Sequence, residues 1–340
     1  MRVVPAGLRI AASDLANFLA CRHLTRLDIA AAYGLVKPTF YNDLGAEALE
    51  QRGREHEARV LTSFAARSWH VEDLTAGESD RTAAAAATAE AMRTGIDIIY
   101  QGTLLVSGHL GLPDFLVRAD LLGSSMGGEL SYEVVEAKLA RTAKARAVLQ
   151  TTFYSALVAD VLGHEPEHMY LALGDEELHR FRVADYAAYM HQVGALLSSF
   201  TAAGPAFPSA DTYPEPVEHC AICRWRGPCQ QQRRDDDDLS LIAGISTRQR
   251  KALKAATIVS RRVFAGLETV PTLERVSTDS MAKAHAQARL QVAGEDSGRL
   301  VWEFVVPERT DDGQLAANRG LTGLTPPSDG DLFFDIEGAR

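Results

Sequence analysis

Residues 132–138 read Tyr-Glu-Val-Val-Glu-Ala-Lys, an apolar strand pattern that ends in Glu136-Ala137-Lys138. Because successive side chains of a strand point to opposite faces, Glu136 and Lys138 are expected to share one face. A carboxylate there can hold a divalent cation, and the ammonium can stabilise an attacking water or the charge that develops on phosphorus. A plain surface ion pair is the alternative for this motif taken alone, so its meaning depends on the rest of the chain.

The segments on either side of this strand alternate between strand and helix patterns. Further strands are expected at 98–106, 114–122, 169–173 and 177–183. Helices are expected at 13–33, 45–66, 81–93 and 143–162, the last of them closed by Gly163. This order predicts an α/β fold in which helices flank a small mixed sheet.

The length of 340 residues exceeds that of a typical single domain, and the composition changes along the chain. Pro, Gly and Cys gather after residue 203, and the acidic run Asp235–Asp238 that follows is typical of a solvated linker. We therefore expect a first domain at 1–234. Three segments should follow it: a helical segment at 235–300, a loop-like linker at 301–330 and the start of another domain at 331–340.

Charge and hydropathy exclude some classes of protein. The net charge of −10 argues against a passive nucleic-acid coat, but it is compatible with a nuclease that uses metal ions and a local basic groove. No apolar run is long enough to span a membrane, and the interrupted N-terminus does not resemble a signal peptide. The cytoplasm is the expected compartment.

Two residues upstream of the strand could complete a metal site with Glu136. Asp114 precedes Glu136 by one strand, so a hairpin can bring the two carboxylates together. Oxygen ligands of this kind suit Mg²⁺ or Mn²⁺. His56, in Gly53-Arg-Glu-His56, could add a nitrogen ligand, although a lone histidine on a helix is usually structural.

Two residues downstream of the strand could support Lys138. Gln150 and Tyr154 are four residues apart on the helix that follows, so they share one face of that helix. From this face polar groups can contact a nucleotide or orient Lys138. Ordinary helix polarity is the alternative explanation.

In order along the chain, these residues resemble the motif set of the PD-(D/E)xK nucleases of the RecB branch. The set is His56, Pro113-Asp114, Glu136-Ala137-Lys138 and Gln150-x-x-x-Tyr154, and the match covers residues 10–232. The resemblance implies a restriction-endonuclease-like core in which His56, Asp114 and Glu136 bind the metal. It also implies that Lys138 is catalytic, with Gln150 and Tyr154 as the helix motif of the branch. The expected activity is metal-dependent hydrolysis of DNA, on single strands or ends, in repair, recombination or processing.

The four cysteines can be assigned to one site. Cys220-x-x-Cys223-x5-Cys229 forms a tight trio in a loop with Pro and Gly, and Cys21 is the only other cysteine. In a reducing cytosol disulfides are rare, and three thiolates need a fourth ligand to close a site. Zinc and a 4Fe–4S cluster both accept four thiolates, and spacing does not decide between them. One early and three late cysteines resemble the CRISPR-associated RecB-like exonucleases and AddB, which implies a 4Fe–4S cluster of structural role.

The segment after the first domain resembles a helix-hairpin-helix, with a turn at Gly244. Basic residues that would face the DNA backbone are Arg248, Arg250, Lys251 and Lys254. A weaker second copy is expected at 270–290. Two packing helices with a solvated basic face are the alternative.

The last ten residues resemble the first strand of an RNase H-like exonuclease domain of the DEDD type. In such a domain Asp335 and Glu337 would bind metal, but their partner acids are not in this sequence. We therefore expect the chain to be part of a longer protein with that domain downstream, and a helicase domain is a further candidate.

Two other classes of function compete with the nuclease. The first is a non-catalytic DNA-binding or assembly module of a larger nuclease–helicase protein. The second is a zinc-stabilised interaction protein that does not bind nucleic acid. The complete set of hydrolytic residues favours the enzyme over both.

Overall fold

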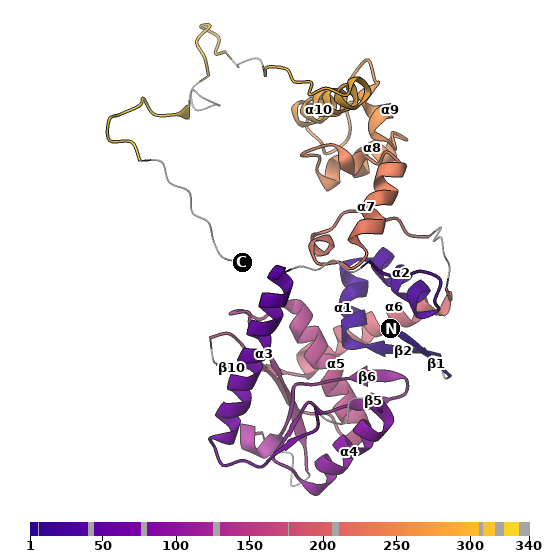
Figure 1. The fold of residues 1–340 in the computed structure, drawn as a ribbon, viewed down its shortest axis with the longest axis vertical. Coiled ribbons are helices and arrows are strands. Elements are labelled where there is room, and N and C mark those ends of the chain that lie inside the picture. Colours follow the sequence, from indigo (N-terminus) through magenta and orange to yellow (C-terminus); the bar gives the residue numbers. More distant parts are fainter. Residues whose placement is uncertain are drawn as a thin grey trace. The chain divides into compact units, whose positions relative to one another are not determined.

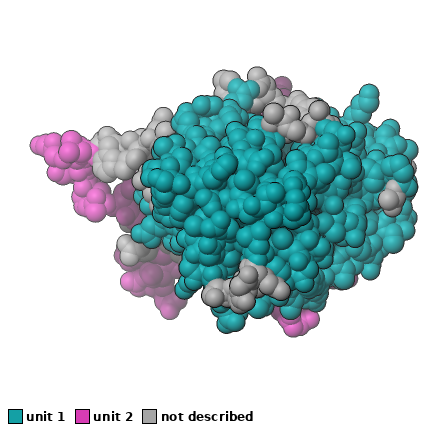
Figure 2. All heavy atoms as spheres, turned by 90° about the horizontal axis from the view of Figure 1, so that it is seen from below, with its two compact units in different colours: residues 1–230 teal, residues 231–340 magenta. Residues whose placement is uncertain are grey.

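The computed structural model describes residues 1–5, 7–39, 44–75, 80–124, 130–175, 177–205, 211–305, 309–316 and 323–332. The chain divides into two compact units, Met1–Gln230 and Gln231–Arg340, which Figure 2 distinguishes by colour. The division falls inside helix α7 (Arg226–Asp235), whereas the composition predicts it after residue 234. None of the described helices is long and apolar enough to cross a lipid bilayer.

The first unit is an α/β structure with two mixed sheets. The larger sheet has the strand order β10 (Leu178–Arg182), β9 (His168–Ala172), β8 (Tyr132–Ala137), β7 (Phe115–Arg118), β4 (Ile98–Tyr100) and β3 (Val71–Asp73). The smaller sheet has the order β1 (Arg2–Val4), β2 (Gly7–Ala11), β6 (His109–Gly111) and β5 (Leu104–Val106). Strand β8 pairs antiparallel with β7 and parallel with β9, so it is central in its sheet.

Helices cover both faces of the larger sheet (Figure 1). The helices of this unit are α1 (Ala12–Ala20), α2 (Arg22–Ala32), α3 (Leu44–Ala65), α4 (Arg81–Thr94), α5 (Ala145–Leu162) and α6 (Ala184–Ala202). Because side chains alternate along a strand, the two faces of the sheet contribute to two hydrophobic cores. Leu116 and Val134 pack with Phe153 of α5 on one face, while Phe115 and Val135 pack with Phe64 of α3 on the other.

Several predicted elements of the first unit differ from the observed ones. The helix expected at 13–33 is two helices, because the backbone of Cys21 is extended between α1 and α2. The residues at 98–106 form β4 and β5 in different sheets, and Gln101 between them has a positive φ of 54° that interrupts an extended chain. The strand expected at 114–122 ends at Arg118 and is followed by a 3₁₀ helix, Ala119–Leu122.

The described part of the second unit is helical. It contains the 3₁₀ helix Leu239–Leu241 and the helices α8 (Thr247–Ala255), α9 (Arg261–Ala265) and α10 (Thr278–Ser297). Leu239, Leu253 and Phe264 pack with one face of α10 to form its core. The helices of this segment range from the five residues of α9 to the 20 residues of α10.

The acidic run Asp235–Asp238 belongs to the folded second unit and is not a solvated linker, so that prediction is also wrong. Asp237 accepts a hydrogen bond from Arg261. Asp238 is only 3% exposed, caps the 3₁₀ helix through Ser240 N and lies 3.1 Å from Lys254 Nζ. The carboxylates in this run therefore stabilise local structure.

Candidate active site

Asp114, Glu136 and Lys138 meet at one end of the larger sheet. The register of β7 and β8 pairs Phe115 with Val135, which sets Asp114 beside Glu136 on the same face. Lys138 Nζ lies 2.6 Å from Glu136 Oε2 and 3.9 Å from Asp114 Oδ2. One ammonium group thus bridges two carboxylates, of which Glu136 is completely buried.

Backbone hydrogen bonds orient the two carboxylates. Asp114 N donates to Glu136 Oε1 over 3.0 Å, and Ala137 N donates to Asp114 Oδ2 over 2.8 Å. Each acid is therefore held by the backbone that carries the other. The sheet therefore fixes the positions of the two carboxylates relative to each other.

Helix α5 brings Gln150 and Tyr154 to the same centre. Gln150 Nε2 lies 3.2 Å from Glu136 Oε2 and 3.1 Å from the Tyr154 hydroxyl. Burial, and then the charge of Glu136, raise the pKa of Tyr154, so its hydroxyl stays protonated. The helix approaches β6 closely at Gly111, where a Cβ would lie 2.8 Å from Leu157 Cδ1. A larger residue at this position would require the Leu157 side chain to shift.

The electrostatics of the centre favour a cation. Burial raises the pKa of Asp114 well above its ordinary value, and the charge of Glu136 raises it further. Burial lowers the pKa of Lys138, but Glu136 and Asp114 together outweigh this effect and raise it, so the ammonium stays charged. A carboxyl whose ionisation is opposed by burial and by a second, buried acid is a site that a divalent cation would stabilise.

His56 of α3 contacts the end of β9, where its Nε2 atom lies 2.9 Å from the Ala172 carbonyl oxygen. The same oxygen accepts a hydrogen bond from Lys138 N over 2.8 Å, so the imidazole adjoins the backbone of the lysine. A carbonyl only accepts, so Nε2 carries the proton and Nδ1 of the neutral ring has a bare lone pair. Nδ1 is buried and has no hydrogen-bond partner among the described residues, which suits a metal ligand.

The ligand atoms of His56, Asp114 and Glu136 do not all lie within 4.8 Å of one another. Within the described ranges, the group of three or more His, Cys, Asp or Glu residues whose ligand atoms all lie within 4.8 Å is Asp175, Glu177 and His179. That group lies at the partly exposed turn between β9 and β10. His56, Asp114 and Glu136 would have to approach one another to coordinate a common ion.

Glu57 is a residue of this centre that the sequence analysis missed. It accepts a hydrogen bond from Gln101, and its charge raises the pKa of both Asp114 and Lys138. Tyr100 has a pKa raised to about 12 by burial and by Glu57. Neighbouring residues on a helix do not share a face. The pattern Gly53-Arg-Glu-His56 therefore predicted a role for the histidine and not for Glu57, which follows it.

The four cysteines come from segments that are distant in sequence. Cys21 separates α1 from α2, Cys220 lies in the 3₁₀ helix Glu218–Ala221, and Cys229 lies in α7. The expectation that the late trio occupies a loop is thus wrong for Cys229, whose helix begins at Arg226. All four thiols are free of disulfides. Burial raises the pKa of Cys223, and the charges of Cys220 and Cys21 raise it further. No three of the four sulfurs, all of which lie in described residues, are all within 4.8 Å of one another.

Hydrogen bonds and packing organise this cysteine site. Backbone N–H groups of Leu24, Val217 and Trp225 donate to the sulfurs of Cys21, Cys220 and Cys223, each over 3.4 Å. Buried Asp28 on α2 accepts from Trp225 Nε1 over 2.6 Å and from Arg224 over 2.7 Å. Donors to sulfur of this kind tune metal–thiolate sites. The donor set therefore fits a group held by four thiolates.

The basic residues predicted to face DNA are used in two ways. Arg248 and Lys251 are exposed on α8. Arg250 is buried and lies 3.2 Å from Thr247 Oγ1, and Lys254 pairs with Asp238. Arg250 and Lys254 therefore contribute to the structure of the second unit. Asp335 and Glu337 lie outside the described residues.

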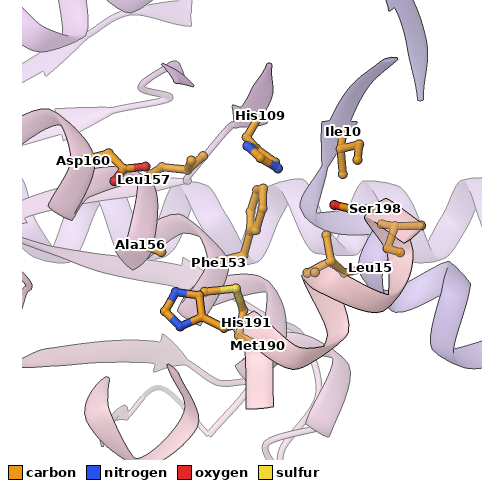
Figure 3. A pocket seen from close by; sticks show the side chains of 12 residues that line it. Ile10, Leu15, His109, Phe153, Ala156, Leu157, Asp160, Met190, His191 and Ser198 are labelled. Carbon is orange, nitrogen blue, oxygen red and sulfur yellow. The ribbon is translucent and has the colours of Figure 1, made fainter. Parts of the chain in front are cut away.

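Helix α5 also borders a pocket of about 250 Å³ that Figure 3 shows in detail. Its lining is mostly apolar and includes Ile10, Leu15 and Phe153, with the rings of His109 and His191 among them. The His109 ring packs edge-on against Phe153, with 5.7 Å between the ring centroids. None of the predicted site residues lines this pocket.

Comparisons with known proteins define no family for the chain. No protein-family model matches it, and no relative is found among curated proteins. A solved structure titled "Crystal structure of SSO0001" aligns with 65% of this chain and 85% of its own, with 12% identity and a TM-score of 0.27. A TM-score this low is not evidence of a shared fold or function. The structure itself defines the class, an α/β protein with two mixed sheets flanked by helices.

Proposed function

We propose that this protein is a metal-dependent deoxyribonuclease with a PD-(D/E)xK core of the RecB type. The observation that carries the proposal is the buried end of β8, where Lys138 lies between the carboxylates of Asp114 and Glu136. Two acids and one lysine at the end of a strand are the groups that phosphodiester hydrolysis with a divalent ion needs. Single-stranded DNA or DNA ends are the proposed substrate.

Each residue of the centre has a proposed task. Asp114 and Glu136 would hold Mg²⁺ or Mn²⁺, with His56 Nδ1 as a further donor. When bound, the ion would polarise the phosphate and lower the pKa of an attacking water. Lys138 would stabilise the negative charge that develops on the phosphate oxygens. Gln150 and Tyr154 are positioning residues, since Gln150 donates to Glu136 and contacts the Tyr154 hydroxyl.

We also propose that Cys21, Cys220, Cys223 and Cys229 hold a 4Fe–4S cluster with a structural role. Support comes from the N–H donors to three of the four sulfurs and from the packing of Cys21, Cys223 and Cys229 against one hydrophobic cluster. Such a cluster would join α2 to the end of the first unit, across a very long chain segment. Zinc is the alternative, and metal analysis separates the two.

A comparison of two buried glutamates on β8 tests the nuclease. Glu136 and Glu133 are both fully buried, but Glu133 accepts from His168 N, away from the acids. With Mn²⁺ and labelled single-stranded DNA, Glu136→Gln should lose at least about 100-fold in rate, as expected for a residue that acts in the transition state. Glu133→Gln should retain activity wherever it folds. Undiminished cleavage by Glu136→Gln would remove this centre from the mechanism.

The second candidate is a non-catalytic DNA-binding module, favoured by the ion pairs that Lys138 forms with both acids. A protein of that kind should bind single-stranded DNA with a strong salt dependence. It should give no turnover with Mg²⁺, Mn²⁺, Co²⁺ or Ca²⁺. Cleavage that Glu136→Gln abolishes would exclude it.

A further inference from the structure

A second cavity, of about 330 Å³, adjoins the acidic centre. Its polar lining consists of Lys138, Thr142, Lys144, Arg146 and Gln150, and no acidic residue is among the residues that line it. Lys138 and Gln150 belong to the acidic centre as well, so the two sites share a wall. We call this cavity the basic pocket.

Two of the three cations of the basic pocket are available to a ligand, whereas Lys138 pairs with Glu136 and Asp114. Lys144 and Arg146 are exposed, and neither forms an ion pair with another residue in the described part of the chain. Lys144 is the N-cap residue of α5, where no side chain caps the helix and no acid lies in the first turn. Helix N-termini carry partial positive charge and usually attract acids. Here two cations add to that charge, an arrangement that a bound anion would stabilise.

The loop that forms the pocket is held against the sheet. Gly174 N donates to the Ala140 carbonyl over 3.1 Å just after β9. A Cβ at Gly174 would lie 2.3 Å from the Leu139 carbonyl oxygen, so only glycine permits this approach. The backbone between β8 and α5 is therefore fixed, and the pocket is formed in advance of binding.

We propose that the basic pocket binds the terminal phosphate monoester of a nucleic-acid strand. A monoester carries about −1.5 to −2 charges at neutral pH, against −1 for an internal diester. It therefore matches a pocket with two exposed cations, Lys144 and Arg146. Because Lys138 and Gln150 are shared, a phosphate held there would bring the strand end next to the acids. The inference rests on the proposed nuclease function and adds to it a preference for phosphorylated ends.

The test compares oligonucleotides that differ only at one end. Single-stranded DNA of one sequence, labelled at the opposite end, carries a 5′-phosphate, a 3′-phosphate or hydroxyls only. Binding to the full chain is measured by fluorescence anisotropy in EDTA, so that no cleavage occurs. One phosphorylated end should bind about tenfold more tightly than hydroxyl ends, the size of one charge-assisted interaction. The oligonucleotide that binds more tightly shows whether the pocket recognises a 5′-phosphate or a 3′-phosphate.

Variants assign the preference to the pocket. The double variant Lys144→Ala/Arg146→Ala should bind both kinds of end equally, and the slope of log K against log salt should fall by about 0.7 for each cation removed. Arg141→Ala is the matched control, because Arg141 is exposed in the same loop and does not line the pocket. It should keep the preference. The variants are exposed substitutions, and thermal melts verify their folding.

The outcomes separate this inference from the nuclease proposal. Equal binding of phosphorylated and hydroxyl ends by the wild type, or a preference that survives in the double variant, would overturn the inference even if the protein cleaves DNA. A preference that disappears only in the double variant supports the pocket even if no metal produces cleavage.

Discussion

Replacement of Asp114 by asparagine should stabilise the metal-free protein and abolish its response to divalent cations. The Asp114 side chain is 18% exposed, and burial and the charge of Glu136 raise its pKa. The amide oxygen of asparagine can still accept the hydrogen bond from Ala137 N. The attraction to Lys138 at 3.9 Å is lost, but Lys138 keeps Glu136 at 2.6 Å. The net change therefore removes a charge that folding opposes.

The sign and size of this effect follow from linkage. An acid whose pKa is raised in the folded state favours folding below its unfolded pKa of about 3.9, and this contribution is lost as the pH rises toward the folded pKa. At pH 7 the wild-type carboxylate is thus a penalty that asparagine does not carry. Relief of about 1 kcal/mol is typical of such substitutions. For a unit of this size it corresponds to a rise in Tm of about 2–4 °C.

Thermal melts at pH 7, with and without Mn²⁺, measure both parts of the prediction. At about 100 times its Kd, Mn²⁺ should stabilise the wild type by about 2.7 kcal/mol, or about 5–10 °C in Tm. Asp114→Asn should begin higher and should not shift. Asp120→Asn is the control, since that side chain is 62% exposed and pairs with Arg118. A lower Tm for Asp114→Asn without metal, or an undiminished Mn²⁺ shift, would refute the reasoning.

Three further predictions concern the cysteine site, the loop before α5 and the second unit. Protein purified without oxygen should be brown and contain iron, and Cys223→Ser should lose both; stoichiometric zinc without iron would exclude the 4Fe–4S cluster. Gly174→Ala should cost about 1–3 kcal/mol in denaturant melts because its Cβ meets a carbonyl oxygen, whereas Gly194→Ala on α6, with open space around it, should not destabilise. Lys254→Ala should destabilise the second unit by about 1–3 kcal/mol because it leaves buried Asp238 without its cation, and Lys251→Ala on the exposed face should leave the melt unchanged.

The geometry of the acidic centre could be predicted because local rules determine most of it. Strand alternation places Glu136 and Lys138 on one face, and helical spacing places Gln150 and Tyr154 on one face of α5. The partnership of Asp114 with Glu136 depends on the register of β7 and β8, which pairs Phe115 with Val135. The two strands are antiparallel neighbours that follow each other in the sheet and in the sequence of the larger sheet's strands. Their pairing is therefore the kind of contact that sequence order suggests.

The smaller sheet could not be predicted for the opposite reason. Strands β1, β5 and β6 have three residues each, too few for an alternating pattern to be visible. The parallel pairing of β2 with β6 joins Ile10 to His109, and no local signal predicts such a distant contact. The prediction that Asp235–Asp238 is a solvated linker was wrong for a related reason. Asp238 is buried and pairs with Lys254 on a separate helix, a contact that the acidic run itself does not reveal.

Lys138 is the residue in which the two proposals meet. Its ammonium lies 2.6 Å from Glu136 Oε2, and a divalent ion would compete with it for this carboxylate. A bound ion would repel the ammonium and weaken its hold on Glu136. The side chain already lines the basic pocket, so a phosphate there offers it a second anionic partner. Metal and phosphorylated strand should consequently favour each other's binding through this one lysine, and because binding free energies are reciprocal, each should raise the affinity for the other by the same factor.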